Sequence, residues 1–151
     1  MYWQSEELSR LGEEVIQKEK SLAWIKEAGV KICFLYSDKE KKKGGRVVLG
    51  DCRLVREPWS VFCPYDFLIT VYEPNTAGLD EQRIHILLFH ELLHVGISEK
   101  DDEPVYRTNP HDVEDFREII ERYGMDWPEV VMQCGEGEVR EVAETGEPAP
   151  D

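Results

Sequence analysis

One apolar, helix-forming segment constrains this chain more than any other feature, because it carries two histidines and a glutamate. The segment spans residues 84–95 and contains the motif HELLH at positions 90–94. On a helix, residues four apart lie just over one turn from each other, so the imidazoles of His90 and His94 point the same way. Two imidazoles so placed can bind one zinc ion, and Glu91 can serve as the base for a water that the metal activates. Three polar side chains in an apolar helix would be costly without such a partner.

A catalytic zinc site needs a third protein ligand, and the chain has only four histidines. His85 precedes His90 by five residues, an offset that turns it away from the metal face of a helix, so we expect a packed or surface residue. His111 and Glu114 follow His94 at a distance that a folded-back loop can span, and they share one helix face. Sites of type His/His/His and His/His/Glu both bind zinc, so either residue could complete the site. His111 is preferred, because imidazoles are scarce in this chain and acids are not.

Length and charge restrict the remaining possibilities. The chain has 151 residues, enough for one domain with its own core, and a formal net charge of −14. This charge disfavours a nucleic-acid-binding surface, which needs a positive field. The sequence predicts no membrane span and no signal peptide, so we expect a cytoplasmic protein. Its four cysteines form no CxxC pair and are expected to be reduced, buried thiols, and the sequence leaves the oligomeric state open.

Helix and strand signals alternate along the first part of the chain. Residues 5–28 predict an amphipathic helix capped by Ser5, and residues 30–36 and 46–55 predict two strands paired as an antiparallel hairpin. Residues 66–72 predict a third strand, apolar enough to be buried on both faces. Asp80 predicts the start of the HExxH helix, which is apolar nearly all round and is therefore expected to be central and to end at Gly96.

The second part of the chain is predicted to hold one more helix and a tail. Residues 98–108 have the composition of a polar loop, and Asn109 with Pro110 predicts a helix start, with Gly124 as its stop. Residues 127–134 are expected to form one more turn or strand. Residues 135–151 are acidic with little to bury, which predicts a disordered tail after a single domain over residues 1–134. The expected fold class is α+β, with a small twisted sheet of about three to four strands.

Five stretches of the chain resemble the phage metallopeptidases, a family of small zincin-like proteins encoded by phages and prophages. The stretches are 50–55, 65–70, 88–95, 110–116 and 123–127, and the HELLH and HDVEDF blocks are the most specific of them. The resemblance extends over about residues 30–127. It implies a minimal zincin-like domain, with a following helix that carries the third ligand, in the cytoplasm of a host cell.

By the same resemblance, the ligands of one zinc ion would be His90, His94 and His111, and Glu91 would be the catalytic base. A more distant similarity connects the chain to SprT-like metallopeptidases, which also use HExxH and a later histidine. The metzincin pattern would need a glycine and a histidine where Ile97 and Lys100 stand, so that class is excluded.

Three functions are compatible with these observations. The first is zinc-dependent hydrolysis of a peptide or protein, with Tyr106 or Tyr65 as hydrogen-bond donor to the oxyanion and an exposed strand, such as residues 66–72, holding an extended substrate. The second is a non-catalytic zinc-binding or protein-interaction module, in which a fourth protein ligand would close the coordination. The third is a SprT-like, nucleic-acid-associated protease. Its only local support is the basic loop 39–46, which a solvated turn explains better.

Overall fold

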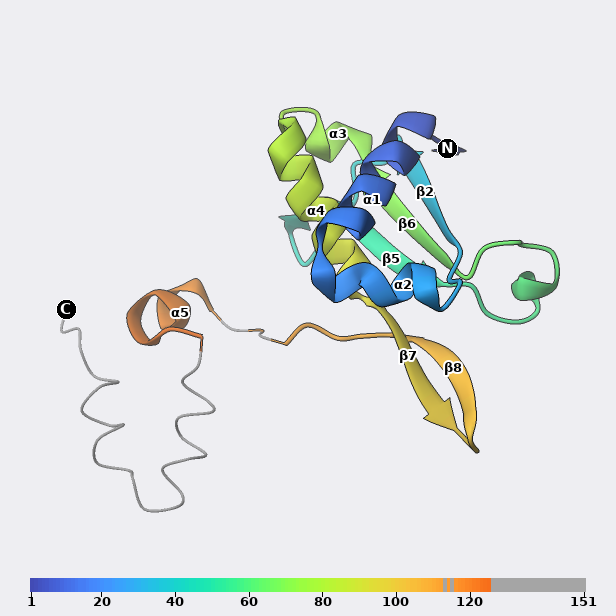
Figure 1. Ribbon diagram of the computed structural model, residues 1–151. Helices are drawn as coiled ribbons and strands as arrows, with labels where there is room; N and C mark the ends of the chain where they lie inside the picture. The colour runs from blue at the N-terminus through green and yellow to red at the C-terminus, as the bar shows by residue number, and fades with distance from the viewer. Residues whose placement is uncertain (113, 115, 126–151) are drawn as a thin grey trace, which may run out of the picture. The chain divides into compact units, whose positions relative to one another are not determined.

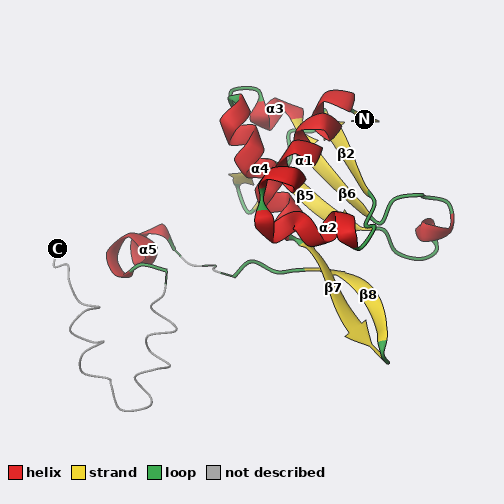
Figure 2. Ribbon diagram, in the orientation of Figure 1, coloured by secondary structure: helices red, strands yellow, loops and turns green. Residues whose placement is uncertain are grey.

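The computed structural model describes residues 1–112, 114 and 116–125, and the chain divides into two compact units, Met1–Pro110 and His111–Asp151. The first unit combines helices with small sheets, so the expected mixed α+β class is confirmed (Figure 1, Figure 2). Its helices are α1 (Glu6–Lys18), α2 (Ala23–Glu27), α3 (Glu73–Thr76) and α4 (Glu81–Leu93), with 3-10 turns at Lys20–Leu22 and Trp59–Val61. Its strands are β1 (Tyr2–Gln4), β2 (Ile32–Ser37), β3 (Lys42–Lys43), β4 (Arg46–Val47), β5 (Gly50–Leu54), β6 (Phe67–Tyr72), β7 (Val95–Lys100) and β8 (Glu103–Thr108). The described part of the second unit holds α5 (Arg117–Tyr123).

The main sheet has four strands in the order β1-β2-β6-β5. The pairing of β2 with β6 is parallel, whereas β1 with β2 and β5 with β6 are antiparallel. Strand β6 is central and almost entirely buried, as its continuous apolar sequence predicts. The predicted hairpin between residues 30–36 and 46–55 is wrong. Strand β6 lies between β2 and β5 and pairs with each of them, so the two do not pair with one another.

Helices α1 and α4 lie side by side over one face of this sheet (Figure 1). The ring of Phe34 in β2 packs so closely on α1 that a Cβ atom at Gly12 would overlap it. Between the helices and the sheet lies a core of buried apolar side chains: Leu8, Val15, Ile16, Leu22, Ile25, Phe34, Phe67, Ile69, Val71, Leu87, Leu88, Leu92 and Val95. This core therefore attaches α4, which carries the HExxH motif, directly to the sheet.

The first helix begins where the sequence predicts, because the Ser5 side chain accepts a hydrogen bond from the Leu8 N–H at 3.1 Å. It does not run unbroken to residue 28. Glu19 adopts extended backbone angles that end α1, and a 3-10 turn then leads into α2. Gly29, with a φ of 71°, ends α2 as predicted.

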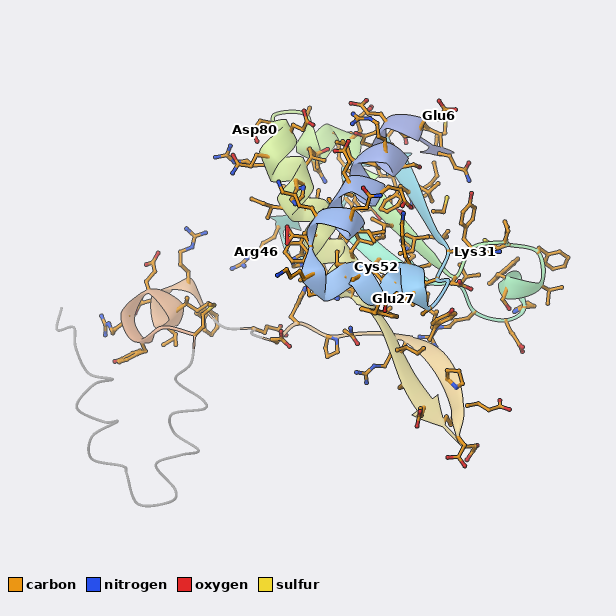
Figure 3. All side chains as sticks on the ribbon, in the orientation of Figure 1. Glu6, Glu27, Lys31, Arg46, Cys52 and Asp80 are labelled. Carbon is orange, nitrogen blue, oxygen red and sulfur yellow. The ribbon has the colours of Figure 1, made fainter. Side chains whose placement is uncertain are left out.

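Helix α4 also begins at its predicted cap, since Asp80 accepts a hydrogen bond from the Arg83 N–H at 2.9 Å (Asp80 is labelled in Figure 3). It is less buried than its composition predicts. Ile86 is 57% exposed and Leu93 is 47% exposed, so one side of the helix opens outward. None of the helices in the described residues combines the length and the apolar character that a membrane crossing requires.

The prediction of a polar loop at residues 98–108 is wrong, because β7 and β8 form a regular antiparallel hairpin there (yellow in Figure 2). Asp101 and Asp102 form its two-residue turn with φ angles of 55° and 65°, a conformation that aspartate tolerates better than most residues. Asn109 does not start a helix either: α5 begins at Arg117, and Gly124 ends it with a φ of 82°. The segment 127–134 and the tail 135–151 lie outside the described residues.

Candidate metal centre

The two histidines of the HExxH motif lie at the end of α4. His90 is in its last turn, and His94 is the C-cap residue, whose backbone angles (φ −75°, ψ −15°) continue the helix for one more position. Their ring centroids are 5.2 Å apart. The predicted helix end at Gly96 is therefore wrong by two residues, but both imidazoles still lie on one side of the helix, as the spacing predicts.

Three imidazoles come together at this end of α4. One ligand atom each from His90, His94 and His111 lies within 4.8 Å of the other two, and Glu114 is not a member of this group. Two nitrogens about 2.05 Å from a tetrahedral zinc ion are about 3.3 Å apart, so the 4.8 Å that bounds this group exceeds the spacing around an ion by about 1.5 Å. Three neutral imidazoles are also a donor set that catalytic zinc uses. The residues present therefore fit a metal ion. That the ion is zinc, and that His111 is the third ligand, stay predictions.

The ring of His94 is oriented by the backbone of Asn109. The His94 Nδ1 atom lies 2.6 Å from the carbonyl oxygen of Asn109, and the Asn109 N–H donates to the His94 carbonyl oxygen at 2.7 Å. A carbonyl oxygen can only accept, so Nδ1 of His94 must carry the proton. In that tautomer Nε2 presents its lone pair, which is the form that a metal ligand needs.

Glu91, the predicted base, is buried next to the main sheet. Its side chain is only 5% exposed, and it lies beside β5, because a Cβ atom added to Gly50 would be 3.5 Å from Glu91 Oε2. Burial, and to a smaller extent the negative charge of Asp51, raise the pKa of Glu91 to about 7. A carboxyl with such a pKa takes up and releases protons near neutral pH.

No motif in the sequence marks Gly50 as a site residue, yet it lies at the start of β5 beside Glu91. We predict that Gly50→Ala lowers the free energy of unfolding by about 1–3 kcal/mol, because the new Cβ atom would lie 2.9 Å from the backbone oxygen of Thr70 on the central strand. Gly78→Ala is the matched control, since nothing lies within 4 Å of its added Cβ atom. Urea denaturation of both variants measures the difference. Equal stabilities would contradict the close packing of β5 against β6.

A cavity of about 440 Å³ opens beside Glu91 and His90. Its walls are mostly apolar and come from the start of β5 and from α4 and the turn before it: Leu49, Gly50, Leu79, Arg83, Ile86, Leu87, His90 and Glu91. The guanidinium of Arg83 donates to the Asp80 carboxylate at 2.9 Å, so its charge is balanced within α4. Only the glutamate and the histidine among these residues were singled out from the sequence, because the others carry no motif.

Other residues weighed as candidates lie in different surroundings. His85 contacts the Glu19 carboxylate at 3.3 Å and does not belong to the histidine group, in agreement with its helical offset. Tyr106 packs edge-on against Phe67, with 5.7 Å between ring centroids. Its role as oxyanion donor, and that of Tyr65, stay predictions. Residues 66–72 cannot add a substrate strand, because β6 is paired on both sides.

The thiols of this unit do not contribute metal ligands. Cys33, Cys52 and Cys63 are free, and Cys134 lies outside the described residues. Cys52, labelled on β5 in Figure 3, has its pKa raised to about 12 by burial and by the charges of Glu91 and Asp51. It is therefore a neutral thiol at physiological pH, and it does not belong to the histidine group.

In the basic loop, one lysine has a structural partner. Lys41 donates to the Asp51 carboxylate at 2.9 Å, and the hydroxyl of Tyr72 donates to the same oxygen at 2.6 Å. Lys42, Lys43 and Arg46 of β3 and β4 are exposed. This ion pair attaches the loop to the sheet, a role that needs no nucleic acid.

Two histidines at the end of a capped helix, a third histidine grouped with them and a buried glutamate define a candidate metal centre of the kind found in metallopeptidases. In a comparison with protein-family models, residues 1–135 match the model described as "Putative phage metallopeptidase". The chain belongs to this family, which agrees with the resemblance of its sequence. No curated protein and no solved structure matches the chain.

Proposed function

We propose that this protein is a zinc-dependent peptidase in which His90, His94 and His111 bind one zinc ion and Glu91 is the general base. The observation that carries the proposal is the group of three imidazoles within 4.8 Å at the end of α4. The family to which the chain belongs supports it, because a metallopeptidase needs such a centre. The buried glutamate next to the first histidine supplies the remaining catalytic group.

Each residue has a distinct part in the proposed reaction. When bound, zinc supplies Lewis acidity, which activates a water molecule and polarises the scissile carbonyl. Glu91 accepts a proton from the attacking water and then donates it to the leaving amine. Its burial keeps bulk water away from the carboxylate, and its raised pKa matches both directions of this transfer near neutral pH. The hydrogen bond from His94 to Asn109 holds one ligand in the required tautomer.

The substrate would lie along β5, which is the edge strand next to Glu91 in the described part of the sheet. An extended peptide can add to such an edge through main-chain hydrogen bonds. The adjacent cavity then receives the side chain of a residue next to the scissile bond. Since the cavity is mostly apolar and Arg83 is paired with Asp80, we expect a large apolar side chain there and not an acidic one.

We predict that zinc-loaded protein cleaves a peptide library preferentially next to large apolar residues and that Ile86→Trp reduces this preference roughly tenfold or more. Ile86 lines the cavity and is 57% exposed, so the larger ring occupies the cavity without disturbing the core. Mass spectrometry of the products, with and without a chelator, gives both the activity and the preference. Val61→Trp is the control, because Val61 is 76% exposed and does not line the cavity.

Two outcomes would count against this function. Cleavage that persists after chelation would show that the metal is not required. A chain that binds zinc tightly but cleaves no member of a broad library would favour a non-catalytic zinc module, and a fourth protein ligand found by X-ray absorption spectroscopy would establish it.

A further inference from the structure

Asn109 makes contacts that its sequence context does not predict. Its side-chain Nδ2 donates to the carbonyl oxygens of Leu93 and Val95, each at 3.1 Å. Its backbone exchanges two hydrogen bonds with His94, one through the ring and one through the carbonyl. A single residue that follows β8 therefore binds the chain on both sides of a proposed zinc ligand, at the last residue of α4 and at the first residue of β7.

Two of these contacts, to the carbonyls of Leu93 and His94, satisfy groups at the end of α4 that have no partner inside the helix. The last carbonyls of α4 have no N–H donor from a following turn, and an unpaired carbonyl costs stability where it is half-buried. Asn109 supplies donors from a position 14 to 16 residues away in the sequence. The hairpin of β7 and β8 brings it there, because Val95 and Thr108 are paired at its base.

Gly96 leaves the room that the Asn109 side chain occupies. A Cβ atom at Gly96 would overlap Asn109 Oδ1 and would lie 2.8 Å from its Cγ. Any other residue at position 96 would thus displace the amide group from its two carbonyl partners. The close approach explains a glycine within β7, where a side chain would otherwise favour the strand.

We infer that Asn109 is a positioning residue of the metal centre, acting through His94. The inference rests on the proposed zinc site and goes beyond it, since Asn109 neither binds the metal nor touches the substrate.

A double-mutant cycle tests this role. We expect Gly96→Ala and Asn109→Ala each to lower zinc affinity roughly 10- to 100-fold, the range for residues that orient metal ligands. The double variant should be no worse than Asn109→Ala alone, because no amide remains for the new methyl group to displace. Asn109→Asp keeps the shape but has no donor for the carbonyls of Leu93 and Val95, so it should also lose affinity. Thr108→Ala, at an exposed neighbouring residue, is the control.

Affinity is measured by competition with a chelating dye, and ¹⁵N NMR of the metal-free protein reports the tautomer of His94. We expect the Nδ1–H form in the wild type and a mixture of tautomers in Gly96→Ala, a change that a general loss of stability would not cause. Additive effects of the two substitutions, or an unchanged His94 signal, would overturn the inference. If the wild type binds no zinc, the proposed function fails, and the NMR signal alone decides the role of Asn109.

Discussion

Replacing Glu91 with glutamine is expected to leave about one zinc ion bound per chain and to lower kcat/KM for peptide hydrolysis by roughly 10²- to 10⁴-fold. Glutamine keeps the shape of the side chain but cannot accept the proton from water. The metal should remain, because Glu91 is not a member of the histidine group. Metal content by atomic emission and kinetics on one cleaved peptide measure the two effects in the same preparation.

Two results would contradict this assignment. Loss of zinc in Glu91→Gln would show that the carboxylate is a ligand. Full activity in the variant would place the base elsewhere. Gly78→Ala serves as the reference preparation, because its added methyl group meets nothing within 4 Å.

In metal-free protein the same substitution should change how stability depends on pH. Burial raises the folded-state pKa of Glu91 from 4.5 to about 7, so the folded protein retains a proton that the unfolded chain releases. The free energy of unfolding of the metal-free protein therefore falls as the pH rises from about 4.5 to about 7, and the loss reaches about 3 kcal/mol at pH 8. Glu91→Gln should remove this loss. Urea denaturation at pH 5 and pH 8, in the presence of a chelator, measures it, and equal pH dependence in both proteins would contradict it.

Replacing His94 with alanine is expected to abolish tight zinc binding and, with it, the stabilisation that zinc confers. A ligand present at a thousand times its Kd stabilises the folded state by about 4 kcal/mol, and this increment should vanish. The melting temperature of His94→Ala should then be the same with zinc and with chelator. The reason is that two imidazoles cannot hold the ion that three hold.

His85→Ala is the matched control, since it removes an imidazole from the same helix. His85 contacts Glu19 and lies outside the histidine group, so this variant should bind zinc as the wild type does. A wild type that shows no shift in melting temperature on addition of zinc would contradict the metal centre. Comparison of His111→Ala with Glu114→Ala, scored by zinc affinity, identifies the third ligand.

Local signals in the sequence predicted the elements that carry the site. Ser5 and Asp80 cap their helices because a side-chain oxygen satisfies backbone N–H groups within three residues. The spacing of His90 and His94 likewise depends only on the helical repeat. The central place of β6 follows from its continuous apolar run, which only a strand covered on both faces can bury.

Features that depend on distant partners were missed. Residues 46–55 are close in sequence to β2, but β5 pairs with β6, since the buried central strand offers two edges. The segment that forms β7 and β8 contains too many charged residues to show a clear strand pattern in the sequence. Its strands become evident only from their antiparallel pairing in the structure. Asn109 has the local signal of a helix cap, yet it satisfies the carbonyl end of another helix. In each case contacts between residues distant in sequence determined the structure, and not the conformational preference of the local segment.

The amino-acid pattern alone predicts a two-histidine metal motif, a base and a third ligand, because imidazole and carboxylate chemistry and the helical repeat are local properties. Folding in three dimensions added the environment of these groups. It buried Glu91 against β5 and set Asn109 on the ring of His94. These relations join residues that are up to about 40 positions apart, and close packing of the whole unit creates them.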